Sequence, residues 1–509
     1  MQRLRPKLSP ELSACARAHV LDVLAMVILY VGASILAGRV WRFPFDDELI
    51  ALAPIERIHS AIGLVVHYLK GGDIHPPLSF LLFYGLYHAG LSEAGIRLCS
   101  LAMTAVSLAI FQLLALMLAA RRDGVPLSTR LIAVLLFGLA PLAVSQGDAI
   151  RWYPMFAMLI AMFVVLYVAA DNDVARFCSA IPLGLAASTN FLAVIVLLPL
   201  ALYRYALQRR FRAPLDLGFA LTALIFGGMG LVSAYSIYTM RLRGVMHTEF
   251  GHGLVQAILT NVLGFFGGDA LGVSQGWIIV PTVIISAVAI VSVIDRKQPD
   301  DPAHLLLLML AATVLMVLPG FAKPRSFLYL APAMAAVLTI FFDRQILLRG
   351  VGAVPLLASL IVVANVGAIA NVNGGTHPFK RNSVIPYRNI IDFIQSNESG
   401  YTAIASTDPV VVWVLQHQHG RQDRCVEYFL AVAKCLVSGR RYDSIFVITG
   451  HSDKPAAKRR RFDQLVGQLT AGRQKVMTFH AGLDEDAELK TRLTGVELAR
   501  YILAVDLYR

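Results

Sequence analysis

Long apolar runs without charged residues dominate the first 376 residues of the chain. A helix needs roughly 20 apolar residues to cross a bilayer, with about 17 as the lower limit. Runs near or above that length lie at 23–38, 98–120, 131–147, 152–170, 217–240, 270–294, 305–322, 326–342 and 350–376. Another run, 177–203, is longer than one crossing and shorter than two. Because Ser188-Thr189-Asn190 interrupts it, we expect two short helices with a polar break that faces protein or a wet cavity.

The composition supports a membrane protein. Hydrophobic residues make up 57% of the chain and charged residues only 15%, against about 25% charged in an average soluble protein. This excludes a disordered chain and an ordinary soluble enzyme. The net charge of +12 is attributed to topology and lipid headgroup contact. We predict no nucleic-acid partner, because aromatic residues are not interleaved with the basic ones.

The basic clusters predict the orientation, because Lys and Arg concentrate in cytoplasmic loops. They are the N-terminal arm, Arg121-Arg122, Arg209–Arg212, Arg296-Lys297 and Arg344–Arg349. No cleavage-site pattern follows the first apolar run, so we expect an uncleaved first span. With every cluster in the cytoplasm, the chain has eleven spans, give or take two. The N-terminus is then inside and the C-terminus outside, provided that 76–92 is a helix lying on or dipping into the outer face.

This topology predicts three parts. Residues 1–19 form a cytoplasmic arm, 20–372 an all-α membrane module, and 373–509 a small α/β domain outside the membrane. The outer polar segments are 39–97, 145–153, 241–275 and 322–325, together with everything after about 372. For a bacterial source, the location is the inner membrane and the outer side is the periplasm.

The C-terminal domain shows alternating helix and strand signals. We expect a helix over 386–397, a strand over Thr402–Ser406, a helix cap at Thr407-Asp408-Pro409 before Val410–His417, a strand over Ser444–Thr449 and a helix over 455–472. Cys425 and Cys435 are the only cysteines of this part. They pair if the domain faces an oxidising compartment and stay reduced otherwise, and the sequence leaves both outcomes open.

Four polar motifs fall on the outer side. They are Arg42–Leu49 with Asp46, Asp47 and Glu48; Gly71–Leu78 with Asp73 and His75; Ser145–Pro154 with Asp148, Arg151 and Tyr153; and Lys323-Pro324-Arg325. Each has a plain alternative, such as a solvated helix start, a polar turn or an interfacial aromatic belt. Two cations on an outer loop, however, run against the positive-inside bias and suggest an anionic partner.

In order and placement these motifs resemble the GT-C glycosyltransferases. The similarity is to the branch of protein O-mannosyltransferases, lipid A aminoarabinose transferases and rhizobial lipopolysaccharide glycosyltransferases. Asp47-Glu48 matches an acidic pair after the first span, and His75–Leu78 matches an [HK]-P-P-L element. Ser145–Tyr153 is similar to S-Q-x-x-R-x-Y with looser spacing, and Pro324–Pro332 resembles P-R-[YF]-x-x-x-x-P. Aminoarabinose transferases carry Lys where His75 stands.

The resemblance implies an inverting transferase that moves one sugar from a polyprenyl-phosphate carrier to a hydroxyl on the outer face. Asp47 would be the base and Glu48 its orienting partner. The substrate-binding residues would be Asp46, Asp73, His75, Asp148, Arg151, Tyr153, Lys323 and Arg325. No resident cofactor or metal is predicted, although Asp46 and Asp47 leave a divalent metal possible near them.

The expected partners are the lipid-linked sugar donor, membrane lipid, and a glycan, glycolipid or protein acceptor. A lipid-linked glycan polymerase or ligase is the nearest enzymatic alternative. A transporter would place ionisable residues at mid-membrane within inverted repeats, and no repeat is visible here. A non-catalytic membrane scaffold is the remaining alternative.

Overall fold

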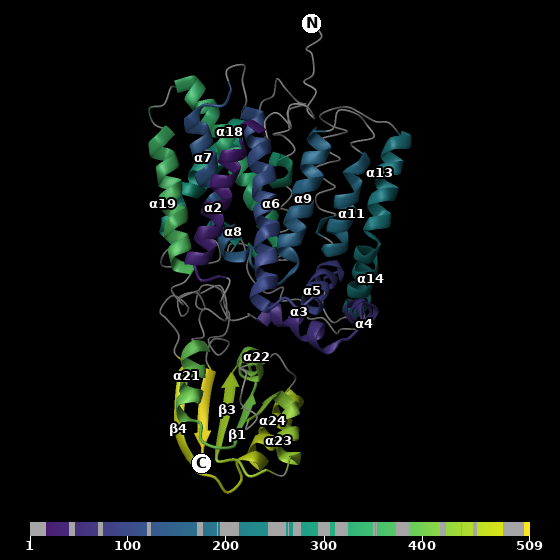
Figure 1. Ribbon diagram of the computed structural model, residues 1–509, viewed down its shortest axis with the longest axis vertical. Helices are drawn as coiled ribbons and strands as arrows, with labels where there is room; N and C mark the ends of the chain where they lie inside the picture. The colour runs from purple at the N-terminus through teal and green to yellow at the C-terminus, as the bar shows by residue number, and fades with distance from the viewer. Residues whose placement is uncertain are drawn as a thin grey trace. The chain divides into compact units, whose positions relative to one another are not determined.

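The computed structural model is mostly helical, with one small β-sheet (Figure 1). It describes residues 17–39, 46–69, 75–119, 124–169, 177–190, 192–193, 213–242, 261–262, 264–267, 276–293, 306–310, 324–349, 352, 354–372, 387–417, 424–438, 440–450, 456–481 and 503–509. The chain divides into two compact units. The first comprises Met1–Trp41, Ile50–Leu271 and Gln275–Asn373, and the second Arg42–Leu49, Gly272–Ser274 and Gly374–Arg509.

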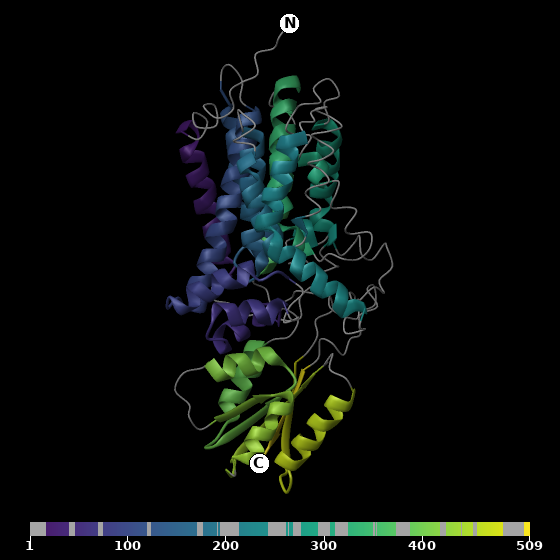
Figure 2. The same cartoon turned by 90° about the vertical axis from the view of Figure 1, so that its right-hand side faces the viewer.

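The described helices before residue 374 lie in or next to the predicted apolar segments, except those over 46–67. They are α2 (Val20–Leu36), α3 (Asp46–Arg57), α4 (Ala61–His67), α5 (Leu78–His88), α6 (Glu93–Ala119), α7 (Leu127–Gly138), α8 (Pro141–Gln146), α9 (Trp152–Ala169), α11 (Ala180–Thr189), α13 (Ala213–Phe226), α14 (Gly228–Leu242), η3 (Gly276–Ile279), α16 (Val280–Val293), η4 (Pro324–Leu330), α18 (Ala331–Arg349) and α19 (Val354–Val372). Figure 2 shows the long helices running side by side.

Among the described residues, three helical segments are individually long and apolar enough to cross a membrane, at 93–119, 127–146 and 326–346. A fourth crossing is added if α13 and α14, bent by 67° at their junction, form one span. Several of the other predicted runs extend into residues outside the description, so the total of eleven stays a prediction. Helix α5 has 11 residues, about 16 Å at 1.5 Å per residue. This length is short of one bilayer crossing, and the expected place of 76–92 on the outer face stays a prediction.

Close contact between backbones packs α11 against α13 and α14. A side chain at Gly184 would collide with the Ala223 carbonyl of α13, and one at Gly230 would collide with the Ala187 carbonyl of α11. Small residues at such contacts are typical of helix packing in membranes. The expected break is present, because α11 ends at Thr189 and Asn190 is extended.

The C-terminal unit contains a three-layer α/β fold. Its elements are α21 (Tyr387–Asn397), β1 (Thr402–Ser406), α22 (Pro409–His417), β2 (Arg424–Tyr428), η5 (Phe429–Val432), α23 (Ala433–Val437), β3 (Ser444–Gly450), α24 (Ala456–Leu469), β4 (Lys475–Ala481) and β5 (Leu503–Tyr508). The sheet order is β2-β1-β3-β5-β4. Strand β1 is parallel to β2 and β3, and β5 is antiparallel to β3 and β4.

Alternation along the central strands produces the two cores of this unit. Ile404 and Phe446 face α21 and α22, whereas Ala403 and Ile445 face η5 and α24. The predicted helix cap is confirmed, since Asp408 Oδ1 accepts the backbone N–H of Val410 at 2.9 Å. The open question about the cysteines is also answered, because Cys425 and Cys435 form a disulfide.

Candidate functional site

The turn between α8 and α9 carries the third polar motif, and two other helices hold it. Tyr30 of α2 donates its hydroxyl to the Ala143 carbonyl at 3.2 Å. Thr104 of α6 donates to the Gly147 carbonyl at 3.1 Å. A side chain at Gly147 would collide with the Tyr30 hydroxyl. Gly147 belongs to the stretch that lengthens the spacing of this motif. Any larger residue at this position would displace α2.

Asp148 lies at the centre of a buried ion-pair cluster. Its carboxylate is 3.2 Å from Arg39 Nη2 and 3.7 Å from Arg97 Nη1, and its side chain is fully buried. Arg97 also pairs with Glu93, and Arg39 donates to the Ser145 carbonyl. A buried carboxylate requires such compensation. Through these ion pairs Asp148 holds the turn between α8 and α9 in place. Its expected contact with a sugar stays a prediction.

Sequence reasoning missed Arg39 and Arg97, although a signal was present. Both flank the segment 39–97, which the sequence predicted to lie on the outer side, where cations run against the positive-inside bias. The same bias singled out Lys323 and Arg325. Applied to 39–97, the bias would have selected both arginines together with Arg42, Arg57 and Lys70. Their pairing with Asp148 is visible only in the fold.

His75, Trp152 and Asn190 come from three separate motifs and meet in the helical unit. The Asn190 amide nitrogen lies 3.0 Å from His75 Nδ1, and the His75 and Trp152 rings are 5.0 Å apart between centroids. The Asn190 amide oxygen accepts the Leu192 backbone N–H at 2.8 Å. Its nitrogen therefore faces His75, so Nδ1 accepts and the ring proton is on Nε2.

Arg151 is buried beside the same cluster. It is 3% exposed, and its guanidinium carbon lies 5.5 Å from the centroid of the Phe80 ring on α5. Phe80 in turn stacks on Tyr68 with centroids 4.0 Å apart. A cation held on an aromatic face keeps its charge and its fixed fork of donors. Arg151 is therefore a buried cation held on an aromatic ring, and its expected contact with an anion stays a prediction.

A chain of aromatic contacts extends from this cluster to the fourth motif. Trp152 meets Phe156 at 5.5 Å, Phe156 meets Tyr329 of η4 at 5.2 Å, and Tyr153 packs edge-on against Trp152 at 4.4 Å. Arg325 is the second residue of the same η4 element. Its side chain lies outside the description, and so does the whole of Lys323.

Two buried polar side chains in this region have no hydrogen-bond partner among the residues that the structure describes. These are the indole N–H of Trp152 and both amide atoms of Gln146, and the two residues are at most 1% exposed. Most buried polar groups in proteins have a hydrogen-bond partner, so both side chains are candidates for contact with a substrate. Sequence reasoning assigned no role to either side chain, although both belong to the S-Q-x-x-R-x-Y-like motif.

The acidic residues of the first motif are described only in part. Helix α3 begins at Asp46, and Glu48 is fully buried. The side chains of Asp46 and Asp47 and all of Asp73 lie outside the described residues. Within the described part, no three His, Cys, Asp or Glu side chains gather as metal ligands would. The assigned roles of the acids therefore stay predictions.

No protein-family model matches the chain, and no curated protein matches its sequence. Solved structures do match its fold. ArnT from Cupriavidus metallidurans in the apo state has a TM-score of 0.53 at 13% identity, over 97% of this chain and 98% of that one. The same protein bound to undecaprenyl phosphate gives a TM-score of 0.50 at 12% identity, over 96% and 98%. The chain therefore shares the fold of ArnT over nearly its full length, in agreement with the fold that the motifs predicted.

Proposed function

We propose that this protein is an inverting membrane glycosyltransferase. It moves one sugar from a polyprenyl-phosphate donor to a hydroxyl of a glycan, glycolipid or protein on the outer face. The observation that carries the proposal is the cluster of His75, Trp152 and Asn190 beside the buried Arg151. The fold likeness supports the donor class, because one matching structure holds undecaprenyl phosphate.

The proposed chemistry is a single displacement. The acceptor O–H gives its proton to Asp47 while its oxygen forms a bond to the anomeric carbon, and the bond from that carbon to the phosphate oxygen breaks. The electron pair leaves with polyprenyl phosphate, so the configuration inverts. Phosphate is a good leaving group, and catalysis then depends on holding its charge and positioning the acceptor.

Four cationic or donor residues are assigned to the phosphate: Arg151, Arg325, Lys323 and His75. The guanidinium of Arg151 suits a bidentate phosphate contact, and His75 offers its Nε2–H because Asn190 fixes the opposite nitrogen. Glu48 orients Asp47, and Asp46, Asp73 and Tyr153 contact the sugar. The orphaned polar atoms of Gln146 and Trp152 are further hydrogen-bonding groups for the donor.

The proposed location is a bacterial inner membrane, with residues 1–19 in the cytoplasm and 373–509 in the periplasm. The Cys425–Cys435 disulfide supports this orientation, because disulfides persist in the periplasm and are rare in the cytosol.

Mass spectrometry of glycolipids and polyprenyl-phosphate sugars tests the proposal. Cells lacking the protein are compared with cells carrying wild type, Asp47→Asn, or Asp463→Asn, which changes an exposed carboxylate of α24. We expect one glycan to lose a single sugar, with donor accumulating, in the null and in Asp47→Asn only. A wild-type profile from normally expressed Asp47→Asn would overturn the assignment. Loss of a whole repeating unit would instead identify a polymerase or ligase.

A further inference from the structure

A polar hollow lies at the edge of the sheet in the C-terminal unit. Its lining includes Tyr401, Gln416, Arg424, Glu427 and Arg440, and β2 is the edge strand beside it. Its volume is about 360 Å³. Sites for small ligands usually enclose roughly 300–1,000 Å³. The hollow is therefore large enough for a saccharide, and it plays no part in the proposed displacement.

Charges in this hollow are paired with one exception. Arg424 forms a two-pronged ion pair with Glu398, and both side chains are at most 5% exposed. Glu427 pairs with Lys434 at 3.2 Å. Arg440 has no acidic partner among the described residues, and its guanidinium carbon lies 5.4 Å from the centre of the Tyr401 ring. The hollow thus presents one uncompensated cation, positioned on an aromatic face.

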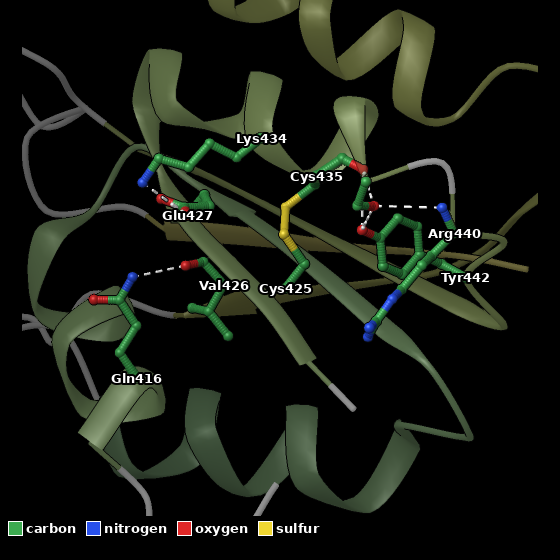
Figure 3. The surroundings of a disulfide bond; sticks show 9 residues. Gln416, Cys425, Val426, Glu427, Lys434, Cys435, Arg440 and Tyr442 are labelled. Atoms are coloured by element: carbon green, nitrogen blue, oxygen red, sulfur yellow. Dashed lines mark hydrogen bonds and ion pairs between the residues drawn. A yellow bond between two sulfur atoms is a disulfide. The ribbon is translucent and has the colours of Figure 1, made fainter. Parts of the chain in front are cut away.

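The remaining polar groups are held in place by the fold. Gln416 donates its amide nitrogen to the Val426 carbonyl at 2.7 Å, which leaves the amide oxygen as an acceptor. The disulfide ties β2 to α23, and Tyr442 donates to the Cys435 carbonyl at 3.0 Å (Figure 3). Because these contacts already hold the lining residues in place, less conformational entropy is lost when a ligand binds.

A saccharide fits these features better than a peptide strand does. A peptide added to the edge of the sheet needs the free carbonyls of β2, but the Val426 carbonyl already accepts the Gln416 amide. Tyr401 is 47% exposed, so part of its surface is open to a sugar ring. Gln416 and Glu427 supply acceptor oxygens for hydroxyl groups.

We propose that this hollow binds an acidic saccharide. Arg440 would hold its carboxylate or phosphate in a charge-assisted contact, while Gln416 and Glu427 accept its hydroxyl groups. This inference rests on the proposed transferase function. The hollow then binds the acceptor glycan, and Arg440 selects an acceptor that carries negative charge.

Saturation-transfer NMR on the full-length protein in detergent tests this proposal, with glucuronate, glucose 6-phosphate and neutral glucose as probes. We expect the two acidic sugars to give signal and glucose to give much less. Arg440→Gln should weaken acidic-sugar binding at least about tenfold, as expected for one charge-assisted hydrogen bond. Arg441→Gln is the matched control, because Arg441 is exposed and does not line the hollow.

The outcomes separate this site from the transferase reaction, because no donor is present and Asp47→Asn should bind the probes like wild type. No acidic-sugar signal with wild type, or equal signals with Arg440→Gln and Arg441→Gln, would overturn the proposal whatever the glycolipid profile shows. Stronger competition by a tetraglutamate peptide than by glucuronate would assign the hollow to acidic protein and would also overturn it.

Discussion

The amide nitrogen of Asn190 lies 3.0 Å from Nδ1 of His75, although 115 positions separate the two residues. Asn190 ends the interrupted helix α11, and His75 precedes the double proline before α5. The contact connects the polar break at 188–190 with the motif at 71–78, which the sequence analysis identified independently of each other. It also fixes which nitrogen of the imidazole carries the proton, because the Asn190 amide oxygen is occupied by Leu192.

Asn190→Ala should lower sugar transfer without preventing folding. Losing one buried hydrogen bond of about 1.4 kcal/mol corresponds to roughly a tenfold decrease in kcat/KM, because His75 is no longer held in one tautomer. Kinetics with purified enzyme and lipid-linked donor measure this. Ser188→Ala is the control from the same break, since its hydroxyl donates to the Phe226 carbonyl at 2.6 Å.

A double-mutant cycle decides whether Asn190 acts through His75. If it does, Asn190→Ala should cost little in a His75→Ala background, because the partner is already absent. Fully additive losses would contradict the positioning role. A fall in melting temperature without a change in kcat/KM would likewise contradict the positioning role and would show that Asn190 contributes to stability only.

The apolar runs predicted most helices because burial in lipid requires long uninterrupted apolar segments. The run starting at 98 still begins too late, since α6 starts at Glu93. Arg97 is accommodated inside this helix because Glu93 and Asp148 neutralise it. Such compensation comes from residues distant in sequence, so a search for charge-free windows cannot find it.

The C-terminal unit shows where strand prediction fails. Strand β1 is buried at every position and was predicted with its observed bounds. Strand β2, Arg424–Tyr428, buries only its central residue, and the charged Arg424 and Glu427 mask the apolar signal. The candidate site shows a similar limit of prediction from sequence. His75, Arg151 and the 188–190 break were each identified from their own motif. The contacts among them depend on tertiary packing, which the sequence pattern does not show.

Asp148→Asn should destabilise the protein. The substitution leaves Arg39 and Arg97 without their shared carboxylate, and an unbalanced buried pair typically costs about 3–5 kcal/mol. We expect a clearly lower melting temperature in detergent, while the exposed change Asp463→Asn leaves it unaltered. An unchanged melting temperature with a raised KM for the donor would instead support the sugar-binding role expected from the motif.

Gly147→Ala should also lower the melting temperature, because the new methyl group would collide with the Tyr30 hydroxyl and the Ala143 carbonyl. Overpacking of this kind costs about 1–3 kcal/mol. Gly85→Ala in α5 is the matched control. Nothing lies within 4 Å of its added carbon, and alanine gains about 1 kcal/mol over glycine in a helix. Equal effects of the two substitutions would contradict the tight packing of the turn against α2.

Removing the disulfide should destabilise the C-terminal unit selectively. Cys425 and Cys435 are separated by 10 residues, and closing a loop of about ten residues contributes roughly 2–3 kcal/mol by limiting the unfolded chain. The double variant Cys425→Ser, Cys435→Ser should therefore melt earlier than wild type, and reductant should have the same effect on wild type only. Cys178→Ser is the control, because Cys178 is a free, exposed cysteine.

Thiol counting checks the same bond independently. The chain has five cysteines, and the bond takes two, so 5 − 2 = 3 should react with maleimide after denaturation without reductant. All five should react after reduction. Protein isolated from the membrane with five reactive thiols before reduction would contradict the disulfide. It would also remove the support that the bond gives to a periplasmic C-terminal unit, since an oxidising compartment would be expected to keep the two cysteines joined.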